Sequence, residues 1–169
     1  MSKPPVSTTC GSSRLAEVPQ LGERGGGWVA LQFVLMAAIV GAVIAWPDVD
    51  STWRSALGAL LFLAGTLVVI LAARALGSSM TPFPRPARAG HLVDEGPYAF
   101  VRHPIYSGGI LVFGGIPLAL SPWALVGAGV LALVWALKAG VEERFLANRY
   151  PAYAEYSARV RFRLVPFVY

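Results

Sequence analysis

Two short polar clusters in this chain carry residue types that perform acid, base and anion-binding chemistry. The first is Arg102-His103, and the second is Glu142-Glu143 with Arg144 directly after it. A proline follows His103, which restricts that histidine to an extended conformation and suits the first turn of a helix. The basic pair is therefore predicted at a helix start, where free backbone N–H groups and the helix dipole favour anions. An interfacial membrane anchor is the alternative interpretation of these residues.

The composition predicts that both clusters belong to a membrane protein. The chain of 169 residues is 56% hydrophobic and only 14% charged, whereas a soluble domain carries about a quarter charged residues. The net charge of +5 does not indicate nucleic-acid binding, because the arginines are scattered through an apolar chain. A single cysteine, Cys10, excludes an internal disulfide and a cysteine-rich metal site. No histidine spacing matches a known ligand pattern, so no metal is predicted.

The first part of the chain predicts a mobile tail followed by two transmembrane helices. Residues 1–27 are rich in proline, glycine, serine and threonine and have no apolar periodicity. Residues 28–46 and 55–73 carry no charge, and each is long enough as a helix to cross the bilayer core. The tail is thus expected to precede a unit of two spans, residues 28–76.

The second half of the chain predicts a tight helical hairpin and brings the count of transmembrane helices to four. Residues 105–137 carry no charge, and one straight helix of that length would be longer than a bilayer is thick. Ser121-Pro122 predicts a turn that leaves two short helices, 105–120 and 123–137. The hairpin returns the chain to its starting side, so the acidic cluster is expected beside the basic pair. Solvated charge at a helix end is the alternative interpretation of the acidic cluster.

A few small and polar residues inside the spans predict contacts between helices. Gly58 and Gly65 lie near one face of the second span and permit close approach of another helix. Gln32 and Thr66 are each expected to form an interhelical hydrogen bond. The fold class predicted from these patterns is an all-α integral membrane protein.

The distribution of basic residues predicts the orientation in the membrane. The two tight turns carry only Arg54, whereas the other 13 of the 14 lysines and arginines lie on the side shared by both termini and the loop 77–104. This asymmetry places both termini and that loop in the cytoplasm, as in a multi-pass protein of a bacterial inner membrane. Near the C-terminus, tyrosines at 150, 153 and 156 with neighbouring arginines predict an amphipathic helix on the membrane surface, or else a solvated cap.

All candidate chemical groups lie on that one predicted face of the membrane. Acids, bases and aromatic rings that converge at a membrane mouth suit a zwitterionic ligand. Arginine pairs with a carboxylate, glutamate accepts from an ammonium group, and aromatic faces bind a sulfonium or an adenine. The groups are His91, Asp94, Glu95, Tyr98, Arg102, His103, Tyr106, Glu142, Glu143 and Arg144.

Two sets of motifs flank the predicted hairpin in a fixed order. The first set is His91-Leu92-Val93, Gly96-Pro97-Tyr98 and Val101-Arg102-His103-Pro104-Ile105-Tyr106-Ser107-Gly108. The second set is Glu142-Glu143-Arg144-Phe145-Leu146, Tyr150-Pro151-Ala152-Tyr153-Ala154-Glu155-Tyr156, Arg159-Val160-Arg161 and Pro166. Together they resemble the isoprenylcysteine carboxyl methyltransferase superfamily, whose wider membership includes phospholipid methyltransferases. The resemblance covers about residues 77–166.

The resemblance implies an integral membrane methyltransferase that uses S-adenosylmethionine and modifies a carboxylate, amine or thiol of a lipophilic small molecule or lipid. It implies that residues 77–169 form the cofactor-binding catalytic region, with the cytoplasmic loop and the C-terminal helix covering the cofactor. The residues implied to bind the cofactor are His91, Leu92, Val93, Gly96, Pro97, Tyr98, Arg102, His103, Pro104, Tyr106, Glu142 and Glu143. The residues implied to be catalytic are Arg102, His103 and Glu143.

Two other functions compete with this interpretation: a membrane reductase related to sterol reductases, which would bind NADPH, and a non-catalytic scaffold or small transporter. For the methyltransferase, the short hairpin predicts a site sunk below the membrane surface and open sideways between helices. Four glycines of the first hairpin helix would leave room there for an apolar chain, or would only allow helices to approach closely. They are Gly108, Gly109, Gly114 and Gly115.

Overall fold

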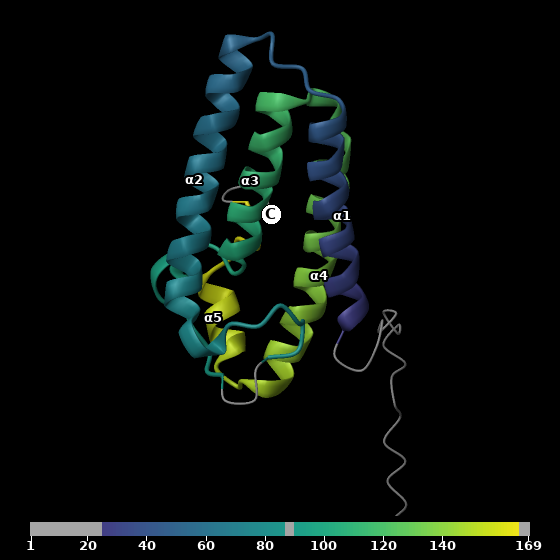
Figure 1. The fold of residues 1–169 in the computed structure, drawn as a ribbon. Coiled ribbons are helices and arrows are strands. Elements are labelled where there is room, and N and C mark those ends of the chain that lie inside the picture. Colours follow the sequence, from purple (N-terminus) through teal and green to yellow (C-terminus); the bar gives the residue numbers. More distant parts are fainter. Residues whose placement is uncertain (1–24, 87–89, 166–169) are drawn as a thin grey trace, which may run out of the picture.

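The computed structural model describes residues 25–86 and 90–165, and this part of the chain is all-helical. The long helices run alongside one another, with two short connections at one end and a long loop with the last helix at the other (Figure 1). The α-helices are α1 (Gly26–Ala45), α2 (Thr52–Leu76), α3 (Pro104–Leu120), α4 (Leu125–Arg149) and α5 (Tyr153–Arg159). Short 3-10 helices are η1 (Gly77–Ser79), η2 (Gly96–Ala99) and η3 (Pro122–Ala124). Residues 1–24 of the predicted tail, with Cys10, lie outside the described residues.

Three of these segments are long and apolar enough to cross a membrane: α1, residues 52–79, and residues 122–149. α3 is equally apolar but shorter, at 17 residues. The first two spans begin and end within a few residues of the predicted limits. The predicted all-helical membrane architecture is therefore confirmed, with three long spans and one shorter apolar helix.

The length of α4 differs from the prediction. The sequence pattern ends this helix near residue 137, whereas α4 continues for three further turns to Arg149. The apolar run stops at Lys138, but the residues after it are good helix formers and the first proline is Pro151. The change from apolar to charged residues marks a change of environment, not the end of the helix. The acidic cluster consequently lies on the same rigid helix as the apolar span.

Four glycines bring α2 and α3 into backbone contact. A Cβ atom added at Gly65 would lie 2.6 Å from the carbonyl oxygen of Gly108, and one added at Gly58 would lie 2.5 Å from that of Gly115. The predicted close-contact face of the second span is confirmed, and α2 is the helix that α3 contacts most extensively. Gly108 and Gly115 therefore serve helix packing and leave no room for a ligand.

The other two glycines of α3 lie in different surroundings. Gly109 faces the ring of Trp135, which would lie 2.6 Å from an added Cβ atom. Gly114 has no atom within 4 Å of that position. Open space therefore exists at Gly114, while Gly109 is covered by an aromatic ring from α4.

The two short connections are joined at the end of the bundle that lies away from the polar clusters. The amide of Asp48 donates to the carbonyl of Leu120 at 2.7 Å, and the hydroxyl of Ser121 donates to the carbonyl of Trp46 at 2.6 Å. Arg54 pairs with Asp48 at 2.8 Å in the first connection. The predicted placement of both turns at one end is therefore confirmed, whereas the side of the membrane that they face stays a prediction.

The C-terminal segment packs against the long loop with its tyrosines turned inward. Tyr153 and Tyr156 are buried, and the hydroxyl of Tyr156 donates to the carbonyl of Tyr98 at 2.9 Å. The hydroxyl of Tyr150 donates to the carbonyl of Gly90 at 2.8 Å. These rings therefore cover the loop, while the predicted position of this helix on the membrane surface stays a prediction.

Candidate functional site

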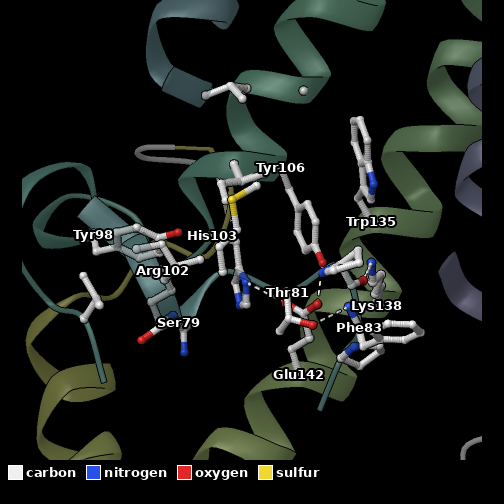
Figure 2. Close-up of a pocket in the computed structure, with 18 of the residues that line it drawn as sticks. Ser79, Thr81, Phe83, Tyr98, Arg102, His103, Tyr106, Trp135, Lys138 and Glu142 are labelled. Carbon is white, nitrogen blue, oxygen red and sulfur yellow. Dashed lines mark hydrogen bonds and ion pairs between the residues drawn. The ribbon is translucent and has the colours of Figure 1, made fainter. Parts of the chain in front are cut away.

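A cavity of about 700 Å³ lies between the four long helices and the loop that follows α2. Figure 2 shows the charged and aromatic part of its lining, which comes from the loop, α3 and α4. Most of the rest of its lining is apolar and comes from the membrane helices and the loop. The charged and aromatic part comprises His91, Tyr98, Arg102, His103, Tyr106, Trp135, Lys138 and Glu142. The apolar part includes Phe33, Met36, Val69, Ile70, Val112 and Phe113.

His103 is the centre of the charged part. It is buried at the start of α3, where Pro104 begins the helix as the sequence predicts. Its Nδ1 lies 3.4 Å from Oε2 of Glu142, and its Nε2 lies 3.3 Å from Oε1 of Glu143. The predicted meeting of the basic pair with the acidic pair is therefore confirmed. One imidazole is held between two carboxylates from α4.

This arrangement changes the acidity of His103. Burial alone lowers the pKa of its imidazole, because the charged form loses its hydration. The hydrogen bonds and negative charges of Glu142 and Glu143 act in the opposite direction and prevail, so the pKa of His103 is raised above its usual value. The positively charged form of the ring is thus favoured between the two carboxylates.

The two glutamates occupy different positions although they are neighbours in the chain. Glu142 lines the cavity, and it accepts a hydrogen bond of 2.5 Å from the hydroxyl of Tyr106. Glu143 lies behind His103, where Arg102 approaches at 3.3 Å and Arg163 donates at 3.0 and 2.8 Å. Glu142 therefore faces the cavity, whereas Glu143 holds the basic groups behind it.

The C-terminal segment fixes the position of this cluster. The backbone amides of Arg102 and His103 each donate at 3.0 Å, to the carbonyls of Phe162 and Arg163. The hydroxyl of Ser107 donates to the carbonyl of Leu164 on the next turn. The start of α3 is therefore held by main-chain contacts as well as by the bundle.

Three rings stack through the middle of the site. His103 and Tyr106 are parallel with centroids 5.7 Å apart, and Tyr106 and Trp135 are parallel at 5.8 Å. Phe113 forms a T-shaped contact with Trp135, with the ring centroids 6.1 Å apart. The stack offers flat apolar faces next to charged groups, which is an environment that binds cations and planar rings.

A second polar group connects α4 to α1. The side-chain oxygen of Gln32 accepts from Nε1 of Trp135 at 3.3 Å and from Nζ of Lys138 at 2.8 Å. The interhelical hydrogen bond predicted for Gln32 is thus confirmed. The prediction for Thr66 is wrong, because its hydroxyl donates to the carbonyl of Phe62 within its own helix.

The structure brings most of the sequence-predicted binding residues to the cavity, while the others lie behind it. Gly96 adopts a positive φ of 59° and, with Pro97, forms the turn that carries Tyr98. Pro104 is buried in the first turn of α3. The residues at the cavity are His91, Leu92, Val93, Tyr98, Arg102, His103, Tyr106 and Glu142, and those outside its lining are Gly96, Pro97, Pro104 and Glu143.

Three other candidate groups lie away from the cavity. Asp94 forms an ion pair with Arg159 at the surface, and Glu95 and Arg144 are exposed. Sequence reasoning in turn missed Trp135 and Lys138. Trp135 lies three residues before Lys138, and Lys138 lies four residues before Glu142. This spacing places all three on one face of α4 and could have revealed them.

Arg163 was also missed, and the sequence holds no local signal for it. It reaches Glu143 only because the C-terminal segment folds back beside the start of α3. The site is consequently assembled from six separate parts of the chain: α1, α2, the loop after α2, α3, α4 and the C-terminal segment.

Comparison with known proteins yields a family and a curated relative. The model of the phospholipid methyltransferase family (PEMT) matches residues 53–153, which run from α2 to the start of α5. The chain is also 36% identical over 142 residues to the cobalt-zinc-cadmium resistance protein CzcN of Cupriavidus metallidurans. That alignment covers 80% of this chain and 61% of the relative, so the chain spans less than two thirds of the relative's length.

Proposed function

Because the chain belongs to the phospholipid methyltransferase family, we propose that it transfers a methyl group from S-adenosylmethionine to a lipophilic acceptor. The family match confirms the resemblance of the motifs and supports a membrane methyltransferase. One observation carries the finer proposal. A single cavity joins a charged, aromatic part to an apolar part between membrane helices, which suits a polar cofactor and an acceptor with an apolar chain.

The charged part of the cavity fits the chemistry of S-adenosylmethionine. Its volume of about 700 Å³ lies in the usual range for sites that bind small ligands. Arg102 offers a cation for a carboxylate, and Glu142 offers an anion for an ammonium group. The faces of Tyr98 and Tyr106 suit a sulfonium or a planar base. When bound, the cofactor supplies a methyl group activated by its positively charged sulfur.

The residues of this chain are proposed to position the reactants and to hold a proton. Glu142 is oriented from two sides, by the hydroxyl of Tyr106 and by the ring of His103. A proton from an amine or thiol acceptor would pass to the carboxylate of Glu142, which the hydroxyl of Tyr106 and the charged ring of His103 hold in place. A carboxylate acceptor needs no base, and then these groups only orient it. Alignment of reactants can lower a reaction barrier by up to about 7–11 kcal/mol.

We further propose that the acceptor enters sideways from the membrane. The apolar lining comes from residues on α1, α2 and α3, such as Phe33, Ile70 and Phe113, within the membrane part of the bundle. An acyl chain lying against them would place its head group beside the stacked rings. The catalytic region proposed as residues 77–169 is accordingly extended to α1 and α2, because both contribute to the lining.

The membrane placement is part of the proposal. With α3 as a fourth, shorter membrane segment, both termini and the site lie on one side, and the distribution of lysine and arginine assigns that side to the cytoplasm. Cysteines placed at Ser51 and Ser121, in a variant without Cys10, are expected to react with an impermeant thiol reagent in intact cells. Labelling of cysteines in residues 77–86 instead would reverse the orientation.

Calorimetry on the detergent-solubilised chain tests the cofactor. S-adenosylmethionine is expected to bind, whereas NADPH, the cofactor of the competing reductase function, is not. Incubation with radiolabelled S-adenosylmethionine and lipid extracts is then expected to label a lipophilic product. Binding of NADPH alone would contradict the proposal.

A further inference from the structure

Lys138 is a buried cation that the proposed reaction does not use. It is 1% exposed and lies on α4 within one of the candidate membrane spans. Its ammonium donates to the side-chain oxygen of Gln32 at 2.8 Å and to the carbonyl of Pro82 at 2.7 Å, both of which are neutral. An ionisable group buried among membrane helices is costly and is retained where it serves a function.

The other charges around the cavity are paired with one another. Glu143 forms ion pairs with Arg102 and Arg163. Glu142 forms an ion pair with His103 and accepts a hydrogen bond from the hydroxyl of Tyr106. Within residues 25–86 and 90–165, no carboxylate lies within ion-pair distance of the Lys138 ammonium. The negative charge of Glu142, one turn further along α4, acts on the Lys138 ammonium through space but forms no ion pair with it. Among the described residues, the cavity wall therefore carries one positive charge that no carboxylate contacts directly.

The ammonium of Lys138 has a donor left for a ligand. A lysine ammonium has three N–H donors, and the two oxygen acceptors described above use two of them. The ring of Tyr106 lies 5.3 Å from Nζ, and the side chain of Lys138 forms part of the cavity lining. An anion in the cavity would thus meet a positioned, poorly hydrated cation.

The position of Lys138 indicates which ligand it meets. Figure 2 shows Lys138 and Trp135 on one side of Tyr106, and Arg102 and Tyr98 on the other. On the Lys138 side, the lining continues along α1 from Gln32 to the apolar side chains of Phe33 and Met36. Lys138 consequently lies where the charged part meets the apolar part, at the place of a head group whose chain occupies the membrane side.

We propose that Lys138 binds an anionic group, a carboxylate or a phosphate ester, on the head of the acceptor. The inference rests on the proposed function and names its acceptor class: anionic amphiphiles are selected over cationic ones. A cationic head group would be repelled at this position, because charge interactions are strong where water is excluded. Gln32 and Pro82 then serve to aim the ammonium, since both hold it from the wall side.

Binding of simple amphiphiles to the full chain, without cofactor, tests the inference. Dodecanoate, dodecyl phosphate and dodecyltrimethylammonium share one chain and differ in head-group charge. In a neutral detergent, both anions are expected to bind about tenfold or more tightly than the cation. In a separate experiment with radiolabelled S-adenosylmethionine, methylation of the dodecanoate carboxylate would identify the anion as the reacting group. Methylation of an acceptor at an atom outside its anionic group would identify the anion as a head-group charge, and either result supports the inference.

Two variants separate anion recognition from a structural role. Lys138→Met removes the charge, and Gln32→Glu keeps the side-chain shape while giving Lys138 a carboxylate partner. Each is expected to abolish the tenfold preference, and Gln32→Glu keeps the protein testable if Lys138→Met does not fold. Thr66→Val is the matched control, because it removes a neutral hydroxyl from the opposite wall and is expected to leave the preference unchanged.

The outcomes that would overturn the inference are distinct from failure of the proposed function. An unchanged preference for anionic amphiphiles in a folded Lys138→Met or Gln32→Glu variant would show that Lys138 has only a structural role. Loss of S-adenosylmethionine binding in Lys138→Met with an unchanged preference would assign the ammonium to the cofactor and overturn the acceptor role. Absence of S-adenosylmethionine binding in the unaltered chain would refute the methyltransferase proposal, whereas the amphiphile measurement stands on its own.

Discussion

The interface of α2 with α3 and the side of the bundle that faces α1 and α4 are built in opposite ways. Between α2 and α3, glycines bring the two backbones together, so an added Cβ atom at Gly65 would lie 2.6 Å from a carbonyl oxygen. On the other side, large side chains such as Trp135 and Lys138 separate α4 from α3 and meet α1 through Gln32. The first region is filled by backbone, whereas the second leaves a cavity.

The difference shows how a small bundle keeps a site in a membrane. The glycine contact makes α2 and α3 a firm unit that carries His103 and Tyr106 at its end. The helices that close the cavity meet through side chains and hydrogen bonds, which allow space for a ligand between them. The packing of one region thus supports the chemistry of the other.

The largest expected effect comes from breaking the glycine contact. Gly65→Leu places a branched side chain against the backbone of α3, which cannot move away without disturbing the start of that helix. Overpacking of this kind is expected to lower the free energy of unfolding by about 3 kcal/mol. Gly129→Leu on α4, where nothing lies within 4 Å of an added Cβ atom, is the matched control. Thermal unfolding in detergent measures both, and equal losses would contradict the contrast between the two regions.

The two glutamates give the next largest effects, and the effects differ in kind. Glu143→Gln removes the carboxylate that pairs with Arg102, His103 and Arg163, and is expected to cost about 2–3 kcal/mol of stability. Glu142→Gln is expected to change stability less but to weaken S-adenosylmethionine binding about tenfold or more, because this carboxylate faces the cavity. Thermal unfolding and calorimetry on both variants distinguish the roles. The prediction fails if the two variants behave alike.

A smaller effect is expected at the ring stack. Tyr106→Phe keeps the parallel contacts with His103 and Trp135 and removes only the hydrogen bond to Glu142. A single hydrogen bond to a charged group of this kind contributes about 1.5 kcal/mol. Cofactor affinity is expected to fall by roughly the corresponding factor of ten, while thermal stability changes little. A collapse of stability would show that the hydroxyl serves the fold and not the site.

The most gradual effect is the dependence of stability on pH. The pKa of His103 is raised in the folded chain, so its charged form is bound more tightly there than in the unfolded chain. The stabilisation is complete below about pH 6.5, the usual pKa of histidine, and is lost as the pH rises through the raised value. In the unaltered chain, the free energy of unfolding is expected to fall as the pH rises over this range. The His103→Gln variant is expected not to show this fall. A decline that persists in the variant would assign it to another group.

Much of the membrane architecture was predictable because it depends on local sequence. Uncharged runs of the right length define the spans, and the turn at Ser121-Pro122 fixes where the chain reverses. Because the chain reverses there, the basic and acidic clusters are carried to the same end. The contact of His103 with the two glutamates therefore followed from helix lengths and topology alone.

Other features were not predictable because they depend on which face of a helix is turned inward. Neighbouring residues on a helix point about 100° apart, so Glu142 reaches the cavity while Glu143 turns to the arginines behind it. The direction of Lys138 was open in the same way. Its position at the end of an apolar run is equally compatible with an exposed group that reaches for the membrane surface.

The sequence by itself determined the class of the protein, its helices and the meeting of its two charged clusters, because hydrophobic length and chain reversal are local properties. The tertiary structure decided which residue of the acidic cluster lines the cavity and which one pairs with the charged groups behind it. Arg163 reaches Glu143 only after the C-terminal segment has paired with the start of α3, and Lys138 is buried where Gln32 from α1 and Pro82 from the loop meet it. Such partners are far apart in the chain, and burial selects them through the packing of whole helices.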